Sequence, residues 1–450
     1  MSRTLIKNAT VVTMDGADYT GDILIADGKI AELGPDLAAE GAEVIDASGM
    51  IAMPGFVNAH IHTWQAGLRG LAADWTLFDY FKGMHAGLAT CFRPEDMEIA
   101  NQVGMLHQLS SGATTIADWC HANHTPDHTD AAIAGLHAAG GRAKFLHGSP
   151  KPDPKPGEPH FSEVPMPRSE IERLRTGTLA SDDALVTMGM AILGPQMSVE
   201  TVVRTDFALA REMDLVTSMH VSGNMLWGNA WAELEQAGLL GRHINIVHGN
   251  GLPDDEVKRL LDNGAMVNVT AEIELQMGFG EPLTRIVSQH ADDQLSIGSD
   301  VESGVAGDMF NVTRITLQSA RHHHTRIVRA ETGAPPEVIG FTTRQALNWA
   351  TMGGARMLRM EDRIGSLTVG KEADIVLLET RSMNMRPVHD PVATIVFHAR
   401  PENVDTVMVG GRIVKRDGKM LGVDLEALTD RLQASGRRVV EEFRGKQAGH

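Results

Sequence analysis

Residues 53–62 read Met-Pro-Gly-Phe-Val-Asn-Ala-His-Ile-His, an apolar run that ends in two closely spaced histidines. Such a run predicts a buried strand over Met53–His60. Side chains two residues apart in a strand point to the same side, so His60 and His62 could reach one metal ion. Two core histidines without a metal would give the same pattern, so the interpretation depends on the rest of the chain.

Seven more apolar runs with the character of buried strands follow, and stretches of helical character separate them. They lie at Ala113–Asp118, Ala143–His147, Val186–Ile192, Leu215–His220, Ile244–His248, Ala265–Thr270 and Leu295–Asp300. Eight strands over some 250 residues match the count and the length of a TIM-like (β/α)8 barrel, an α/β fold. A doubly wound open sheet is the alternative, but the first strand is not followed by the Gly-x-Gly-x-x-Gly turn of dinucleotide-binding folds.

Short β segments at both ends of the chain indicate one small β-sandwich domain built from both. They are expected at Thr4–Ile6, Thr10–Thr13, Asp22–Ala26, Lys29–Leu33, Ala42–Asp46, Asp374–Leu378, Ile395–Phe397, Thr406–Val409 and Gly411–Val414. From residue 424 on, apolar residues recur at helical spacing. The sequence therefore predicts a composite β-sandwich of residues 1–53 and 361–423, a catalytic barrel of residues 54–360, and a C-terminal helix of residues 424–450.

The charge balance and the cysteine content limit which classes of partner and which cellular compartment are expected. The chain has 40 Lys and Arg against 58 Asp and Glu, a net charge of −18, which argues against nucleic acid and anionic membranes as partners. No apolar run approaches the ~20 residues of a membrane helix, and the first residues lack the apolar core of a secretory signal. Only two cysteines are present, Cys91 and Cys120, which excludes a disulfide scaffold and fits a reducing cytoplasm. We expect a cytoplasmic protein that acts on a small molecule.

Polar residues stand at the ends of four of the predicted strands. Besides His60 and His62, the fifth strand ends at His220, the sixth at His248 and the eighth at Asp300. In a barrel these ends converge on one mouth, where such enzymes keep their active sites. Three imidazoles and a carboxylate suit zinc or iron(II), with an open position for a water that the metal activates. Asp300 is then a natural acceptor for the proton of that water, and His248 could hold a developing oxyanion.

Other side chains that follow the strands are candidates for the pocket. The predicted substrate-binding residues are Trp64, Gln65, His121, Trp227 and Ser303. Four of the six tryptophans lie in these loops, which indicates a flat or apolar substrate held by stacking. The alternative is that some of these tryptophans only pack the loops. Glu272 follows the seventh strand and either faces the mouth, where it could carry a proton, or is a solvated loop carboxylate.

Two further segments stand out along the chain. Seven prolines between Pro150 and Pro167 exclude a helix or a central strand, so a long loop is predicted beside the mouth, where a lid would lie. His322–His324 looks like a metal-binding tract, but its flanks predict an amphipathic helix. The side chains of successive residues in a helix point about 100° apart, so three consecutive side chains cannot bind one ion. We interpret this triplet as part of the surface.

Several motifs together resemble the amidohydrolase superfamily, most of all its branch of cytosine deaminases, adenosylhomocysteine deaminases and triazine chlorohydrolases. The first is the segment at residues 53–62, followed by Leu-Arg-Gly at residues 68–70. Val-His-Gly-Asn at residues 247–250, Gly-Ser-Asp at residues 298–300 and GSLTVGKEADIV at residues 365–376 match in kind and order. The resemblance covers nearly the whole chain, including the split β domain, and it implies a homodimer or a larger homo-oligomer.

The resemblance also implies a site with one divalent metal, Zn²⁺ or alternatively Fe²⁺. Its ligands would be His60, His62, His220 and Asp300, with His248 as an electrophile that does not bind the metal. Dinuclear members of the superfamily use a carboxylated lysine on the fourth strand. The predicted fourth strand, Val186–Ile192, contains no lysine, so the residues favour a single metal as well.

At one position this chain differs from the residue that is usual in this branch of the superfamily. Its ring deaminases usually carry a glutamate three residues after the strand-five histidine, and that glutamate passes a proton to the ring nitrogen. This chain has Gly223 there. Loss of a positioned acid or base typically costs ~10²–10⁴-fold in rate. Either another acid substitutes, or the reaction needs none at that point.

The sequence thus predicts a metal-dependent hydrolase that uses activated water to cleave a C–N bond of a small, heterocyclic or aromatic substrate. Asp300 would take the proton of the water, and His248 would support the negative charge that forms on the substrate. Asp300, or Glu272 if it reaches, would return a proton to the leaving nitrogen. A hydrolytic dechlorinase of an azine-like ring is the alternative, because chloride leaves without a proton. A non-catalytic metal-binding barrel is a second alternative, although none of the expected ligands is missing.

Overall fold

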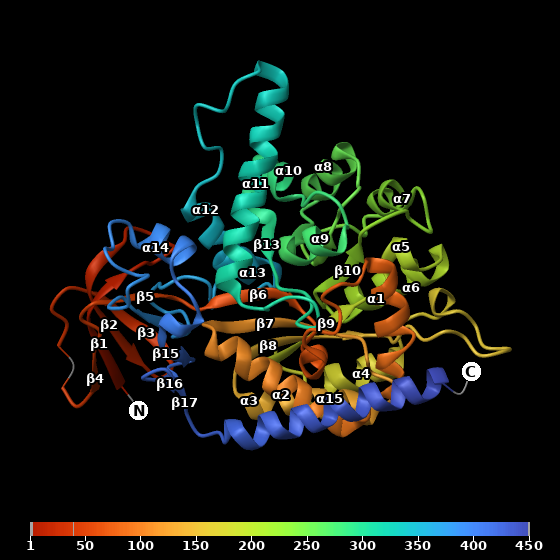
Figure 1. Ribbon diagram of the computed structural model, residues 1–450, viewed down its shortest axis with the longest axis horizontal. Helices are drawn as coiled ribbons and strands as arrows, with labels where there is room; N and C mark the ends of the chain where they lie inside the picture. The colour runs from red at the N-terminus through yellow and green to blue at the C-terminus, as the bar shows by residue number, and fades with distance from the viewer. Residues whose placement is uncertain (1–2, 39, 449–450) are drawn as a thin grey trace.

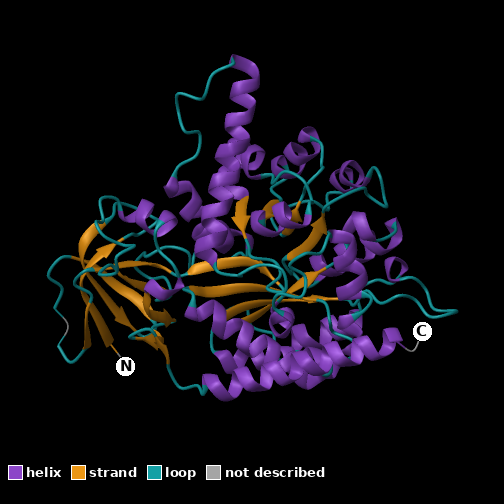
Figure 2. Cartoon of the chain, in the orientation of Figure 1, coloured by secondary structure: helices purple, strands orange, loops and turns teal. Residues whose placement is uncertain are grey.

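The computed structural model of the chain describes residues 3–38 and 40–448. Eight parallel strands form a nearly closed barrel with helices around it, and a second, mixed sheet built from both chain ends lies beside the barrel (Figures 1 and 2). This confirms the predicted fold class. Where the chain divides into domains stays a prediction.

The barrel contains all eight predicted strands in chain order, each paired in parallel with the next. They are β6 (Phe56–Ile61), β7 (Ala113–Cys120), β8 (Arg142–Gly148), β9 (Val186–Ala191), β10 (Thr217–Val221), β11 (Ile244–His248), β12 (Met266–Val269) and β13 (Leu295–Ile297). Nearly all of their residues are buried, which explains why the strands read as continuous apolar runs. The first predicted strand is in fact two, since β5 (Met50–Pro54) belongs to the second sheet.

The barrel closes where the segment after β13 meets β6. Here the backbone N–H of Asp300 donates to the carbonyl of His60 (2.9 Å), and the N–H of His62 donates to the carbonyl of Asp300 (2.9 Å). Gly298 permits this approach, because a Cβ at that position would lie 2.6 Å from the carbonyl oxygen of His60. The close contact brings the carboxylate that follows the eighth strand to the histidines of the first.

Helices surround the barrel and connect its strands. The longer ones are α2 (Pro94–Ser110), α3 (Pro126–Ala139), α4 (Arg168–Thr176), α6 (Glu200–Glu212), α7 (Ala230–Gln236), α8 (Asp254–Asp262), α10 (Thr284–Ala291) and α11 (Met309–Thr332), followed by the short α12 (Thr343–Asn348) and α13 (Gly354–Met357). Three short helices follow strands at the mouth: α1 (Leu77–Tyr80), α5 (Gly194–Met197) and α9 (Ala271–Met277). The proline-rich segment is a loop with one short 3-10 turn, Phe161–Glu163, as predicted.

The second sheet joins the two ends of the chain through the antiparallel pair β5 and β14. Its remaining strands and their bounds are β1 (Arg3–Val11), β2 (Tyr19–Ala26), β3 (Lys29–Gly34), β4 (Glu43–Asp46), β14 (Ile375–Glu379), β15 (Val404–Val409), β16 (Arg412–Arg416) and β17 (Lys419–Met420). The strand expected at Ile395–Phe397 is wrong, since these residues end the helix α14 (Pro391–Phe397). Asp390 caps this helix by accepting from the N–H of Ala393 (3.0 Å), and this local signal outweighs the β-branched run.

The last helix, α15 (Leu425–Ala448), runs along α2 at the bottom of the molecule (Figure 1). Gly436 lies so close to Gly67 that a Cβ at Gly436 would be 2.1 Å from the Gly67 carbonyl oxygen. Gly67 belongs to the 3-10 turn Thr63–Leu68, which directly follows His62, so the helix supports the segment that carries this histidine. Within the described ranges, no helix is long and apolar enough to cross a membrane.

Candidate metal centre

Four of the predicted residues meet at the mouth of the barrel. His60, His62, His220 and Asp300 each offer one ligand atom, and these atoms all lie within 4.8 Å of one another. Asp300 Oδ1 is 3.3 Å from His60 Nε2 and 3.2 Å from His62 Nε2, and His220 Nε2 is 3.2 Å from His60 Nε2. Residues as far apart in sequence as 60 and 300 therefore share one small space, as the strand-end argument predicted.

The orientation and the charge of these side chains fit a divalent cation. His62 Nδ1 donates to the carbonyl of Trp119 (2.6 Å), which fixes the ring so that its Nε2 faces Asp300. Burial lowers the pKa of His60 to about 4, so this imidazole is neutral near pH 7. Burial by itself would raise the pKa of Asp300, but hydrogen bonds with His60 and His62 outweigh it and hold that pKa well below its usual range. Neutral imidazoles around one carboxylate are the donor set that zinc and iron(II) prefer.

The backbone is unusual at two of these strand ends. His248 has φ +71° and Asp300 has φ +63°, both in the left-handed region that residues other than glycine seldom adopt. Such a conformation costs roughly 1–3 kcal/mol and is retained mainly at functional sites. Both residues turn sharply at the mouth, which aims their side chains toward the cluster.

His248 lies beside the cluster and is held from behind. Its Nε2 is 3.8 Å from Asp300 Oδ2, while its Nδ1 is 2.9 Å from Thr270 Oγ1 and 3.3 Å from Glu274 Oε1. Glu274 is fully buried and also accepts from the N–H of Thr270 (2.8 Å). This carboxylate fixes the orientation of the imidazole, so that Nε2 points toward the space above Asp300.

The structure places Glu274 rather than Glu272 beside His248. Both residues lie on α9, where positions two apart face different sides of the helix. Glu272 Oε1 accepts from Asn311 of α11 (2.7 Å), away from the cluster. Burial, together with the charge of Asp308, raises the pKa of Glu272 to about 7. The sequence pattern gave no means of separating the two glutamates, because it did not predict that the segment after β12 is helical.

A small cavity opens over the cluster. It is lined by His62, Leu77, Tyr80, Phe81, His85, Lys151, Met197, His220, Ser222, His248, Phe279 and Asp300. Five of these side chains are aromatic or imidazole rings outside the four-residue cluster, and Asp300 is the one carboxylate among the described lining residues. The cavity therefore suits a small ring-containing or apolar molecule with its reacting atom at Asp300.

The predicted substrate-binding residues lie around this cavity, and none of the five is among its described lining residues. Trp64 is fully buried against His121, and the ring of His121 packs in turn on His62. Gln65 accepts from Ser303 Oγ (2.7 Å) and donates to the hydroxyl of Tyr80 (2.6 Å), so this pair positions a lining residue. Trp227 instead packs under the guanidinium group of Arg204, outside the cavity.

Sequence reasoning missed several lining residues, above all Tyr80, Phe81, His85 and Lys151. They belong to the loops after β6 and β8, and the paths of these loops depend on tertiary contacts rather than on a local pattern. His85 Nδ1 is 3.0 Å from His121 Nε2, so a predicted residue contacts a missed one. The aromatic pair Tyr80-Phe81 in an otherwise aromatic-poor chain was the one available signal.

The site has no acidic side chain at Gly223. A Cβ there would lie 3.3 Å from Nε2 of Gln196, whose Oε1 accepts from the N–H of Ser222 (2.7 Å). A neutral carboxamide therefore sits next to the position where the branch usually has its glutamate. The side of the cavity around Ser222 and Met197 carries no negative charge.

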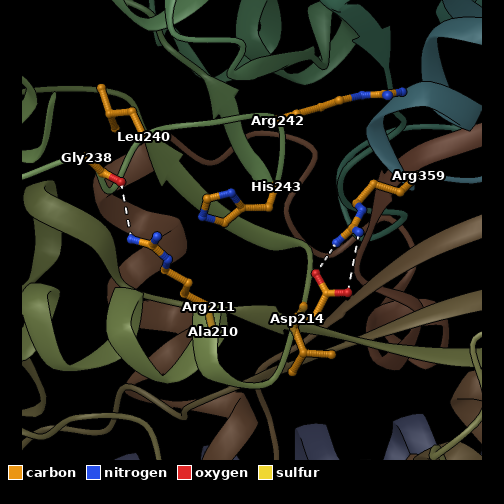
Figure 3. Close-up of a pocket in the computed structure, with 9 residues that line it drawn as sticks. Ala210, Arg211, Asp214, Gly238, Leu240, Arg242, His243 and Arg359 are labelled. Carbon is orange, nitrogen blue, oxygen red and sulfur yellow. Dashed lines mark hydrogen bonds and ion pairs between the residues drawn. The ribbon is translucent and has the colours of Figure 1, made fainter.

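A larger cavity lies at the opposite end of the barrel, where β10 and β11 begin (Figure 3). It is lined by Arg211, Arg242 and Arg359, among others, and Figure 3 shows the ion pair between Arg359 and Asp214. Its charged groups are largely exposed, and barrel enzymes place their chemistry at the carboxyl ends of the strands. We therefore assign the active site to the cavity over the four-residue cluster.

Comparison with known proteins agrees with this assignment. The family model for the amidohydrolase family matches residues 51–414. This chain belongs to the amidohydrolase family. The match spans the barrel strands and the junction with the second sheet, and it confirms the resemblance found in the sequence motifs.

Curated relatives of this amidohydrolase include deaminases that match it from end to end. A 5-methylthioadenosine/S-adenosylhomocysteine deaminase of Desulforudis audaxviator is 28% identical, covering 98% of this chain and 99% of the relative. An 8-oxoguanine deaminase of Pseudomonas aeruginosa is 29% identical, covering 98% of this chain and 100% of the relative.

Solved structures share the fold of this amidohydrolase. An adenosine deaminase from Xanthomonas campestris with bound zinc superposes with a TM-score of 0.81 at 21% identity, covering 99% of both chains. An atrazine chlorohydrolase from Arthrobacter aurescens complexed with zinc gives a TM-score of 0.83 at 22% identity, covering 96% of this chain and 100% of the other.

Proposed function

We propose that this amidohydrolase is a metal-dependent hydrolase that breaks a C–N bond of a small molecule, by deamination or by amide- or urea-type hydrolysis. The observation that carries the proposal is the cluster of His60, His62, His220 and Asp300 beneath a small cavity, with His248 directed at its edge. The deaminase names of its end-to-end relatives support the type of bond.

The four-residue cluster would hold the metal, which supplies hydroxide near neutral pH by lowering the pKa of a water. Asp300 would accept the proton of that water, because it is the carboxylate of the cluster and its lowered pKa keeps it ionised. His248, oriented by Glu274, donates from Nε2 to the oxygen or nitrogen of the substrate on which negative charge develops.

Return of a proton to the leaving group also falls to Asp300. Gly223 offers no acid, and the carboxylate of Glu272 is bound to Asn311, away from the cavity. A single carboxylate that both accepts and returns the proton favours substrates whose leaving group needs no second proton donor. This observation supports the second candidate function, hydrolytic dechlorination of an azine-like ring, since chloride leaves unprotonated. A non-catalytic barrel fits less well, because the full donor set and its oriented neighbours are retained.

The test is a panel assay on protein stripped of metal and reloaded with one equivalent of Zn²⁺ or Fe²⁺. Azines, ureas and pterins are supplied, each ring in an amino and a chloro form, and ammonia, amine and chloride are measured. We expect metal-dependent release of ammonia or amine, and release of chloride alone would favour the second candidate. A metal-loaded protein that hydrolyses no member of either series, with Asp300→Asn equally inert, would favour the non-catalytic barrel.

We further propose zinc as the resident metal, the cytoplasm as the compartment and a homodimer or larger assembly in solution. The donor set supports zinc. Cys91 and Cys120, both free and buried, support a reducing compartment. Exposed Val338 and Ile339, on the segment that follows the projecting helix α11 (Figure 1), support self-association. Metal analysis and light scattering of the purified protein check the first and the last of these.

A further inference from the structure

The mechanism above leaves one charged residue of the cavity unused. Lys151 lies in the proline-rich loop three residues after β8, is 5% exposed, and lines the cavity. Its Nζ is 5.2 Å from the centroid of the Trp119 ring. Among the described residues, no carboxylate lies within ion-pair distance of Nζ, and Nζ makes no hydrogen bond. Lys151 is also the one lysine or arginine among the described lining residues.

A buried ammonium group without a counterion is unfavourable. Removing one from water costs several kcal/mol, and a contact with an aromatic ring returns only about 0.5–2 kcal/mol of this. Burial accordingly lowers the pKa of Lys151 to about 7. Most lysines avoid this situation by extending the ammonium group into solvent. At Lys151 the head group is instead kept inside the cavity, where a bound anion would provide the missing partner.

We propose that Lys151 binds a carboxylate group of the substrate, so that the molecules hydrolysed here are small monoanionic amides, ureas or heterocycles. This inference rests on the proposed function and specifies its substrate class. A single cation balances a single negative charge. A dianionic phosphate group would call for further cationic or fork-shaped donors, and the described lining residues include no arginine.

The position of Lys151 relative to the cluster suits a small substrate that reaches both. Trp119, whose ring contacts Lys151, also packs on His220 with 4.3 Å between the ring centroids. Trp119 is fixed in turn, because its indole N–H donates to Ser218 Oγ (3.2 Å). One rigid side chain thus sets the place of the ammonium group against a proposed metal ligand.

The glycine at position 223 fits the same inference. A glutamate there would add a negative charge beside Ser222, at the edge of a small cavity that already holds Asp300. Repulsion between like charges in so small a space would weaken binding of an anionic substrate. The chain instead combines an uncharged residue at Gly223 with the lysine at position 151, which has no counterion, and both features favour a carboxylate.

The experiment uses benzoate and its neutral analogue benzamide as probes of the zinc-loaded protein, with affinities from isothermal titration calorimetry. We expect the wild-type protein to bind benzoate at least tenfold more tightly than benzamide. Lys151→Met, which keeps the length of the side chain but not its charge, should lose at least tenfold for benzoate and little for benzamide. Lys151→Arg should retain the preference, and Lys151→Gln, a second variant that removes the charge, should lose it as Lys151→Met does. Removal of the unpaired buried charge should not lower the melting temperature.

Two outcomes would overturn the inference: equal affinity of the wild-type protein for the two probes, or unchanged benzoate affinity in Lys151→Met, which would mean that benzoate contacts only the metal. If Lys151→Met does not fold, Lys151→Gln decides, and an unchanged affinity for benzoate in that variant overturns the inference. Failure of the proposed function looks different, because binding would still depend on Lys151 while no substrate is hydrolysed. Failure of the inference alone leaves an active hydrolase whose KM values are unaffected by Lys151→Met.

Discussion

The molecule has two groups of histidines that stand out in the sequence as possible metal ligands, and the sequence favours only one of them. One consists of the strand-end residues His60, His62, His220 and His248 at the mouth of the barrel, and the other is the triplet His322–His324 on α11. At the mouth, imidazoles from β10 and from the end of β6 come within 3.2 Å of one another at their Nε2 atoms. On α11, consecutive side chains diverge around the helix axis.

The partners of the two groups differ in the same way. His323 pairs with Glu281 at 3.0 Å on the surface, and the ring of His324 packs near that of Phe341. Three of the imidazoles at the mouth, those of His60, His62 and His248, face one carboxylate, Asp300, and are buried. The number of histidines in a segment therefore says little about metal binding. A metal site forms where the ends of several strands bring their side chains to one point.

The largest effect is expected from His220→Ala, which removes one of the four convergent donors. We expect loss of stoichiometric zinc and a fall in kcat/KM of about 10³-fold or more, because the metal's stabilisation of the transition state is worth several kcal/mol. Metal analysis and steady-state kinetics measure both. His322→Ala on α11 is the matched control and should retain zinc and activity. Full zinc occupancy in His220→Ala would contradict the assignment.

A smaller effect is expected from Glu274→Gln, since this residue acts through the orientation of His248. Loss of such an outer partner typically costs 10–100-fold in activity. The fall should appear in kcat, with zinc content unchanged, because His248 is not one of the four proposed ligands. Glu272→Gln is the control, with an expected change below about twofold. A larger loss in Glu272→Gln than in Glu274→Gln would reverse the roles assigned to these two glutamates.

The two groups should also differ in how they make stability depend on pH. The pKa of His60 is lowered by burial to about 4, whereas an unfolded chain binds this proton near 6.5. The unfolded state therefore holds more protons in this window, and the metal-free protein loses stability as the pH falls from about 6.5 to about 4, by roughly 3 kcal/mol for this group. Urea unfolding of metal-free protein at several pH values measures the slope. His60→Gln should reduce it, and His323→Gln should reduce it less, because His323 lies nearer the surface and faces Glu281. An unchanged slope in His60→Gln would contradict this account.

Sequence reasoning predicted the part of the site that follows from strand periodicity. The two-residue alternation and the common end of parallel strands were sufficient to predict His60, His62, His220 and Asp300, although these residues lie in three separate segments. It could not place Lys151, because that position depends on how a long loop folds back over the barrel.

The sequence predictions that differ from the structure also have specific physical causes. Glu272 was weighed in place of Glu274 because the helix after β12 was not foreseen, and a shift of two residues on a helix changes the face. At Ile395–Phe397 the capping residue Asp390 and the following proline started a helix within a β-branched run. The approach of Gly298 to His60, on which the whole cluster depends, is a tertiary contact with no local signature.

The smallest effect is expected from His323→Gln. This change removes the surface pair with Glu281, whose side chains are 21% and 37% exposed, and pairs of this kind contribute at most about 1 kcal/mol. Zinc stoichiometry and kcat/KM should stay at wild-type values, and the melting temperature should move by no more than a few degrees. A drop in bound metal in this variant would mean that α11 also holds an ion, and the contrast between strand-end and helical histidines would no longer stand.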